Sequence, residues 1–116
     1  MKQNLLAIPI FVIALVTYAV TMPTTITLED AGLFQMICYQ NGIAHPPGYP
    51  IFTLACRTLV ITPEIMNGNL VSALFGSFTA AIFFFLLLSI TRNFIVATSA
   101  ALSYAFTATF WAQSII

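Results

Sequence analysis

The chain has 116 residues, of which 60% are hydrophobic and only 5% are charged, and its formal net charge at pH 7 is zero. Soluble domains carry about 25% charged residues, so most of this chain should be solvated by lipid rather than water. A balanced charge gives no reason to expect a nucleic-acid partner. The polar groups concentrate in residues 23–66, which hold most of the charged side chains and the histidine. This loop is therefore where chemistry is expected.

The first apolar run covers residues 5–22 and contains no charge. Its length is close to the ~20 residues that a helix needs to cross a bilayer. A signal peptide is the alternative, but the run exceeds the hydrophobic region of about 7–15 residues in such peptides, and no A-x-A site follows. We therefore expect a retained membrane helix, with Pro9 in its first half, where a kink is tolerated.

Two further apolar runs, residues 67–90 and 94–116, predict a second and a third transmembrane helix. The connection between them, residues 91–93, is so short that the two helices should form an antiparallel hairpin. Small residues recur at every fourth position in both helices. This spacing lets helix backbones approach closely in lipid, although small residues are also simply common in membrane helices. The two series are Ser72, Gly76, Ala80 and Ser99, Ser103, Thr107.

These elements predict an all-α membrane protein with three spans and an orientation set by its positive charges. Lys2 and Arg92 fall on the same side of three spans, and that side should be cytoplasmic. The loop of residues 23–66 then faces the periplasm, the exterior or a lumen. The sequence stops at Ile116 inside an apolar run. We therefore expect residues 1–116 to be the N-terminal segment of a single, larger multi-pass domain.

The loop itself predicts a short amphipathic helix that begins near Glu29 and runs for about three turns. Thr27 and Asp30 have the spacing of a capping box, and Asn41-Gly42 supplies a stop. Several apolar residues fall on one face of such a helix, which should lie on the membrane surface or against neighbouring helices. They are Leu33, Phe34, Ile37 and Cys38.

A proline-rich run, His45-Pro46-Pro47-Gly48-Tyr49-Pro50, separates this helix from the next. Proline forbids regular helix before residue 51 but suits the first position of a helix, so a second interfacial helix is expected over residues 50–60. Thr62-Pro63-Glu64 then predicts a cap leading into the second span. Long ordered loops of this kind are usually functional.

The candidate chemical groups of the loop are Glu29, Asp30, His45, Tyr49 and Arg57. An acid at a helix start can act as a general base, and an arginine can hold a phosphate. Each group also has a structural interpretation. Asp30 can be a capping residue, Glu29 a solvated first-turn acid, His45 a structural hydrogen-bonding group, and Arg57 a side chain extending to lipid headgroups.

The two cysteines, Cys38 and Cys56, both lie in the loop region. They can pair if the loop faces an oxidising compartment. Because free thiols in apolar surroundings are common, we expect the two cysteines to be unpaired. The single histidine and the absence of zinc-ligand spacing argue against a zinc site. Gln113, in the third span, can serve a packing contact or touch substrate.

Several segments in this order resemble a family of multi-pass membrane proteins related to protein O-mannosyltransferases, which are thought to share the type-C glycosyltransferase fold. The matching segments are EDAGLF at 29–34, GIAHPPGYP at 42–50, Arg57, NLVSALFG at 69–76 and FWAQ at 110–113. Relatives continue for many more helices after the last segment.

The resemblance implies an inverting sugar transfer from a polyprenyl-phosphate donor to an acceptor hydroxyl on a protein or glycan. Asp30 matches the catalytic base, and His45, Tyr49, Arg57 and Glu29 match the substrate-binding segments. Relatives often read Asp-x-Gly-Glu, whereas this chain has Leu33 in place of the second acid. A role that needs two acids, such as binding a divalent metal, is therefore not supported, and the segment alone should be inactive.

The alternative is a non-enzymatic multi-pass membrane protein, such as a transporter piece or a scaffold, whose loop is only structural. A charged residue facing a cavity between spans would favour transport, but the three predicted spans contain none. Further spans and outer loops in the complete reading frame would favour the enzyme.

Overall fold

The computed structural model describes residues 6–25, 29–40, 42–43, 48–59 and 67–116. Within these ranges the regular structure is entirely α-helical, as the sequence predicts. The described helices are α2 (Ala7–Thr21), α3 (Glu29–Gln40), α4 (Pro50–Leu59), α5 (Asn67–Thr91), α6 (Phe94–Ala105) and α7 (Ala108–Ser114).

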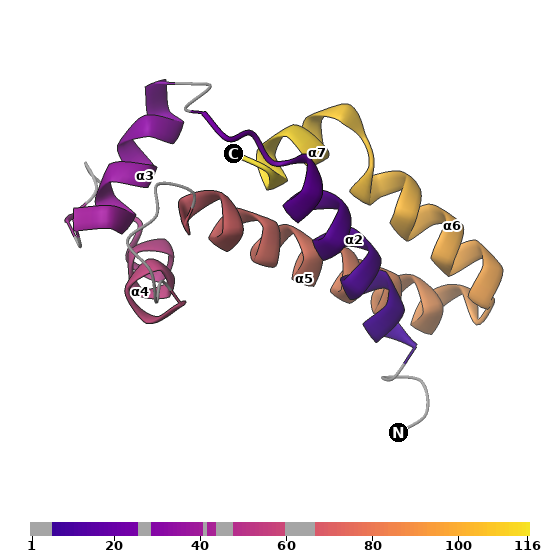
Figure 1. Cartoon of the computed structure of the whole chain (residues 1–116). Helices are drawn as coiled ribbons and strands as arrows, with labels where there is room; N and C mark the ends of the chain where they lie inside the picture. The colour runs from indigo at the N-terminus through magenta and orange to yellow at the C-terminus, as the bar shows by residue number, and fades with distance from the viewer. Residues whose placement is uncertain (1–5, 26–28, 41, 44–47, 60–66) are drawn as a thin grey trace.

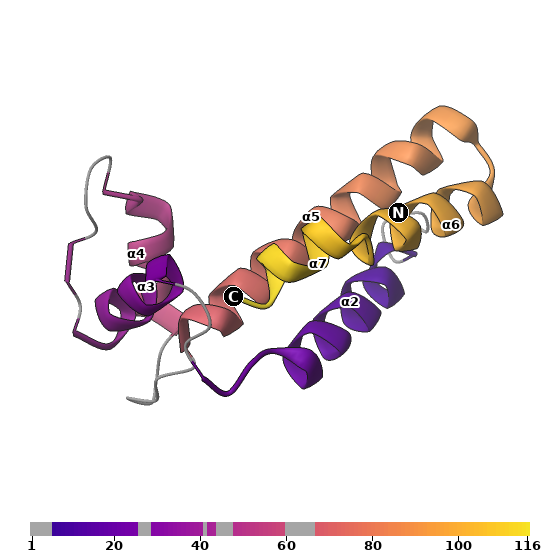
Figure 2. The same cartoon turned by 90° about the horizontal axis from the view of Figure 1, so that it is seen from above.

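The long helix α5 organises the fold, because each of the other described helices contacts it. Helices α2, α6 and α7 lie along α5, and α3 and α4 pack at its N-terminal end (Figures 1 and 2). The start of α2 and the turn between α5 and α6 lie at the opposite end of the molecule (Figure 1). The two short helices of the loop and the hairpin turn therefore lie at opposite ends of α5.

One described helix is by itself long and apolar enough to cross a membrane. Helix α5 has 25 residues, and at ~1.5 Å per residue it spans about 37 Å, more than the ~30 Å of a hydrocarbon core. Helix α2 is apolar but has only 15 residues. Helices α6 and α7 pass the same test only as a bent pair. The prediction of three spans thus has one clear helix, and the number of spans stays a prediction.

The end of α2 follows from the proline after it. Met22 is extended, with ψ of 140°, as expected for a residue that precedes proline. Pro9 falls in the first turn of the helix, where its missing N–H would have no intrahelical partner in any case. The helix therefore needs no kink at this proline, contrary to what its position in a run starting at residue 5 suggests.

The predicted hairpin between the second and third apolar runs is confirmed. The Asn93 side chain accepts hydrogen bonds from the backbone amides of Ile95 at 3.0 Å and Val96 at 3.3 Å, which caps the start of α6. Arg92 adopts the left-handed conformation, with φ of 53°, which lets the chain reverse immediately after α5.

The prediction of one continuous helix over residues 94–116 is wrong. The chain breaks between Ala105 and Ala108, and the axes of α6 and α7 meet at 67°. The Tyr18 hydroxyl donates to the Ala105 carbonyl at 2.8 Å, and the Trp111 indole donates to the Thr21 hydroxyl at 3.1 Å. The Tyr18 hydroxyl thus gives the Ala105 carbonyl a partner where the helix breaks, and the Trp111–Thr21 bond ties α7 to α2.

The small-residue series of α5 lies at a helix interface, whereas that of α6 does not. Gly76 and Ala80 are buried, and a Cβ on Gly76 would lie 2.8 Å from the Ser114 Cβ of α7. The close approach of helices predicted for this series is therefore present. In α6 the predicted series is exposed, and a different series packs in the core: Ala97, Ala101 and Ala105.

The two short helices of the loop match their predicted ranges. In α3, Ile37 and Cys38 are buried while Leu33 and Phe34 are half-buried, as the amphipathic pattern predicts. The Gly42 amide donates to the Ile37 carbonyl at 3.1 Å, which closes the helix end. Helix α4 begins at Pro50, as predicted. The predicted caps at Thr27 and at residues 62–64, and the predicted last residue of the second helix, Val60, lie outside the described residues.

Candidate functional site

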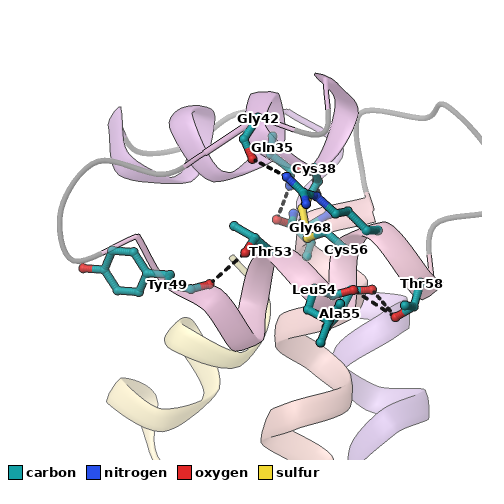
Figure 3. The surroundings of a disulfide bond; sticks show 12 residues. Gln35, Cys38, Gly42, Tyr49, Thr53, Leu54, Ala55, Cys56, Thr58 and Gly68 are labelled. Carbon is teal, nitrogen blue, oxygen red and sulfur yellow. Dashed lines mark hydrogen bonds between the residues drawn. A yellow bond between two sulfur atoms is a disulfide. The ribbon is translucent and has the colours of Figure 1, made fainter.

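A disulfide joins α3 to α4. Cys38 and Cys56, both almost fully buried, are bonded to each other, with their Cα atoms 5.1 Å apart (Figure 3). The expectation of free thiols is therefore wrong. Spacing alone does not reveal the pairing, because it depends on the α4 helix folding back against α3. The bond fixes the relative position of the two helices that carry the candidate residues.

Arg57 supports the same junction from the next position of α4. Its Nη2 atom donates to the carbonyl oxygen of Gly42, just after the end of α3, at 3.4 Å (Figure 3). The guanidinium group is exposed. This contact uses part of the side chain for structure and leaves it on the surface of the α3–α4 unit.

Three aromatic rings from α3, α4 and the end of the proline run form a cluster. The Phe34 ring packs edge-on against Tyr49 and Phe52, with centroid distances of 5.0 and 5.1 Å. Gly48 and Tyr49 both have positive φ, 92° and 42°. Because a tyrosine rarely adopts this conformation, tertiary contacts such as the ring cluster must hold it there.

Gln35 is a buried polar residue that ties α3 to the first turn of α5. Its side-chain oxygen accepts from the Gly68 amide at 3.1 Å (Figure 3). Its side-chain nitrogen donates to the Asn69 side-chain oxygen. The Gly68 amide belongs to the first turn of α5, where no intrahelical acceptor exists. Sequence reasoning missed Gln35, although a glutamine in line with Ala31 and Cys38 on the buried face is a signal that a partner is needed.

A pocket of about 380 Å³ opens where α3, α4, α5 and α7 meet. Its wall combines aromatic rings with uncharged polar side chains. The lining residues are Ala31, Phe34, Gln35, Tyr49, Phe52, Gly68, Asn69, Ser72, Gln113 and Ile116.

The structure brings only part of the predicted site to this pocket. Tyr49 lines it, and so does Ala31, the neighbour of Asp30 in the first turn of α3. Arg57 is not among the lining residues. The structure describes the backbone of Glu29 and Asp30 as the start of α3, and the predictions for their side chains and for His45 lie outside what it describes.

Two further residues, Gln113 and Ser72, line the pocket because of how the helices pack. The bend between α6 and α7 places Gln113 at the pocket, and Ser72 faces it from α5. Among the described side chains, no three histidines, cysteines, aspartates or glutamates gather as they would around a metal ion.

Comparison with known proteins identifies the family. Residues 30–116 match the family described as the Protein O-mannosyl-transferase TMEM260 N-terminal domain. This chain belongs to that family. The resemblance to protein O-mannosyltransferase-related proteins inferred from the sequence motifs is thereby confirmed.

Two relatives have the same name and match this chain over stretches of different length. Protein O-mannosyl-transferase TMEM260 of Mus musculus is 28% identical over 113 residues, which are 94% of this chain and 16% of the mouse protein. The Dictyostelium discoideum protein of that name is 39% identical over 44 residues, 38% of this chain and 5% of its own length. No solved structure matches the chain. The chain thus spans a small N-terminal part of the relatives it resembles.

Proposed function

We propose that this chain forms the N-terminal part of a membrane mannosyltransferase that transfers a sugar from a polyprenyl-phosphate donor to a hydroxyl of a protein acceptor. The observation that carries the proposal is the family match, which begins at residue 30 and includes every residue of the pocket. The matched relatives are named as O-mannosyl-transferases.

Asp30 acts as the general base in this proposal. Its carboxylate takes the proton of the acceptor hydroxyl as the oxygen attacks the anomeric carbon of the sugar. The bond from that carbon to the phosphate oxygen breaks on the opposite side, so the configuration inverts and polyprenyl phosphate leaves with the bonding electron pair. A positioned base of this kind contributes about 10²–10⁴-fold to the rate.

The remaining candidates bind the substrates. Arg57 and His45 supply positive charge or hydrogen bonds to the phosphate as negative charge develops on it. Tyr49 and Glu29 contact the substrate beside the base. The position of Tyr49 on the pocket wall supports its part in this proposal.

The disulfide supports the outward orientation of the α3–α4 unit. Disulfides form and persist in oxidising compartments, such as the periplasm, a lumen or the cell exterior. A Cys38–Cys56 bond is therefore consistent with this unit on the outward side and the start of α2 in the cytoplasm. A lipid-linked donor can reach such a unit from the bilayer.

The test is Asp30→Asn in the complete protein that carries this segment, assayed for sugar transfer from a polyprenyl-phosphate mannose to acceptor protein. We expect the turnover number to fall by about 10²–10⁴-fold, because the amide cannot accept the proton. Glu64→Gln, the same acid-to-amide change at an acid outside the predicted site, serves as the control and should retain most of the turnover. Wild-type turnover of Asp30→Asn at normal expression would refute the role of the base.

A further inference from the structure

Among the described residues, none of those that line the pocket at the junction of α3, α4, α5 and α7 has a charged side chain. Aromatic rings, including Phe34 and Tyr49, form one part of the wall, and serine and carboxamide side chains, including Ser72 and Gln113, form another. Its volume of about 380 Å³ falls within the ~300–1,000 Å³ of typical small-molecule sites. The lining therefore indicates the chemistry of its ligand.

An anionic ligand does not fit this wall. Phosphate groups in proteins are held by arginine, lysine or clusters of backbone amides. The lining residues that the structure describes include no basic side chain, and the Arg57 guanidinium donates to the Gly42 carbonyl. The phosphate of a donor should therefore lie outside this pocket.

A purely apolar ligand does not fit either. Within the described part of the chain, the Ser72 hydroxyl and the Gln113 carboxamide make no hydrogen bond of their own. An alkyl chain in the pocket would displace water from both groups without replacing its hydrogen bonds, which disfavours such a ligand.

An uncharged sugar ring satisfies both halves of the wall. Its hydroxyls can pair with serine and carboxamide groups, and its C–H bonds carry slight positive charge that suits the negative face of an aromatic ring. The Gln35–Asn69 hydrogen bond, anchored on the Gly68 amide, holds two of the carboxamides in place before any ligand arrives.

We propose that this pocket binds the pyranose ring of a sugar, and that Ser72 and Gln113 determine its specificity by hydrogen-bonding the ring hydroxyls. The inference rests on the proposed function insofar as the ring belongs to the sugar being transferred. The pocket thereby separates the recognition of the neutral sugar from that of the charged phosphate.

The experiment measures sugar binding by saturation-transfer NMR with the complete protein in a detergent that has no sugar headgroup. The probe is methyl α-mannopyranoside, and a parallel arm uses polyprenyl phosphate without sugar. At about 10 mM, the probe occupies about nine-tenths of a site whose Kd is about 1 mM. Ser72→Phe fills the pocket. Gln113→Leu replaces the carboxamide by an apolar side chain of similar size, which cannot form hydrogen bonds. Ser99→Phe, on the exposed face of α6, is the matched control.

We expect the mannoside signal to persist in the wild type and in Ser99→Phe, and to be lost in Ser72→Phe and reduced at least tenfold in Gln113→Leu. Gln113 is exposed, so its variant should fold even if the larger substitution does not. An unchanged mannoside signal in Gln113→Leu overturns the proposal. So does a signal from sugar-free polyprenyl phosphate that the two pocket variants abolish.

The outcome is independent of the catalytic proposal. If Asp30→Asn transfers sugar at the wild-type rate while the mannoside signal depends on Ser72 and Gln113, the base is wrong and the pocket stands. If Asp30→Asn is inactive and the mannoside signal is unchanged in both pocket variants, the role of Asp30 as base is retained and the sugar binds elsewhere.

Discussion

Replacing Gly76 by alanine tests the packing that carries α7 to the pocket. The new Cβ would lie 2.8 Å from the Ser114 Cβ and 3.3 Å from Cε2 of the Tyr18 ring, and it would also overlap the Ser114 hydroxyl oxygen. A Cβ atom is bonded directly to the backbone, so Ser114 cannot rotate away, and helix α7 must shift instead. Overpacking of this kind costs up to about 3 kcal/mol, and alanine returns about 1 kcal/mol of helix propensity.

The expected net loss is about 2 kcal/mol in the free energy of unfolding, measured as a lower midpoint in thermal denaturation of the protein in detergent micelles. Gly42→Ala is the matched control, because its Cβ would have only ordinary contacts, the nearest at 3.8 Å from the Ile37 Cα. Adding Ser114→Gly to Gly76→Ala should restore most of the loss, since it removes the clashing atoms. The reasoning is refuted if Gly76→Ala melts with the wild type, or if Ser114→Gly fails to rescue it.

Two further predictions concern the α3–α4 unit. Cys38→Ser should lower stability by about 3 kcal/mol, because the Cys38–Cys56 bond closes a loop with a sequence separation of 18. After denaturation, a maleimide should label Cys56 in the variant and neither Cys38 nor Cys56 in the unreduced wild type; labelling of these two residues in the wild type without reductant would contradict the prediction. Gln35→Ala should lower the free energy of unfolding by about 2–3 kcal/mol, because it leaves the Gly68 amide and the Asn69 side chain without their partner. Limited proteolysis should then cleave the α3–α4 segment faster than in the wild type. An unchanged cleavage rate would count against this role of Gln35.

The sequence predicts the elements whose causes are local. Pro50 marks the first residue of α4, and the short connection before Asn93 predicts the hairpin that the structure contains. The i, i+4 pattern around Ile37 identifies the buried face of α3. In each case the residues that decide the structure are neighbours in the chain.

The features that sequence reasoning missed depend on contacts between distant segments. The break after α6 is held by Tyr18 and by Trp111 with Thr21, and Tyr18 lies 87 residues before the carbonyl that it satisfies. By hydropathy alone the same stretch is one continuous apolar helix. The polar side chains of the pocket are equally non-local, because Gln35 and Gln113 line the same pocket only when α7 has folded back along α5.

The Tyr18–Ala105 hydrogen bond also imposes an order on assembly. The hairpin of α5 and α6 is made from neighbouring segments and can form as soon as both have been synthesised. The bend before α7 is different, because a buried carbonyl left without a partner costs about 1–3 kcal/mol. Helix α7 can therefore take its final position only once α2 is already packed against α5. Helix α2 thus acts as a template for α7, which is synthesised later.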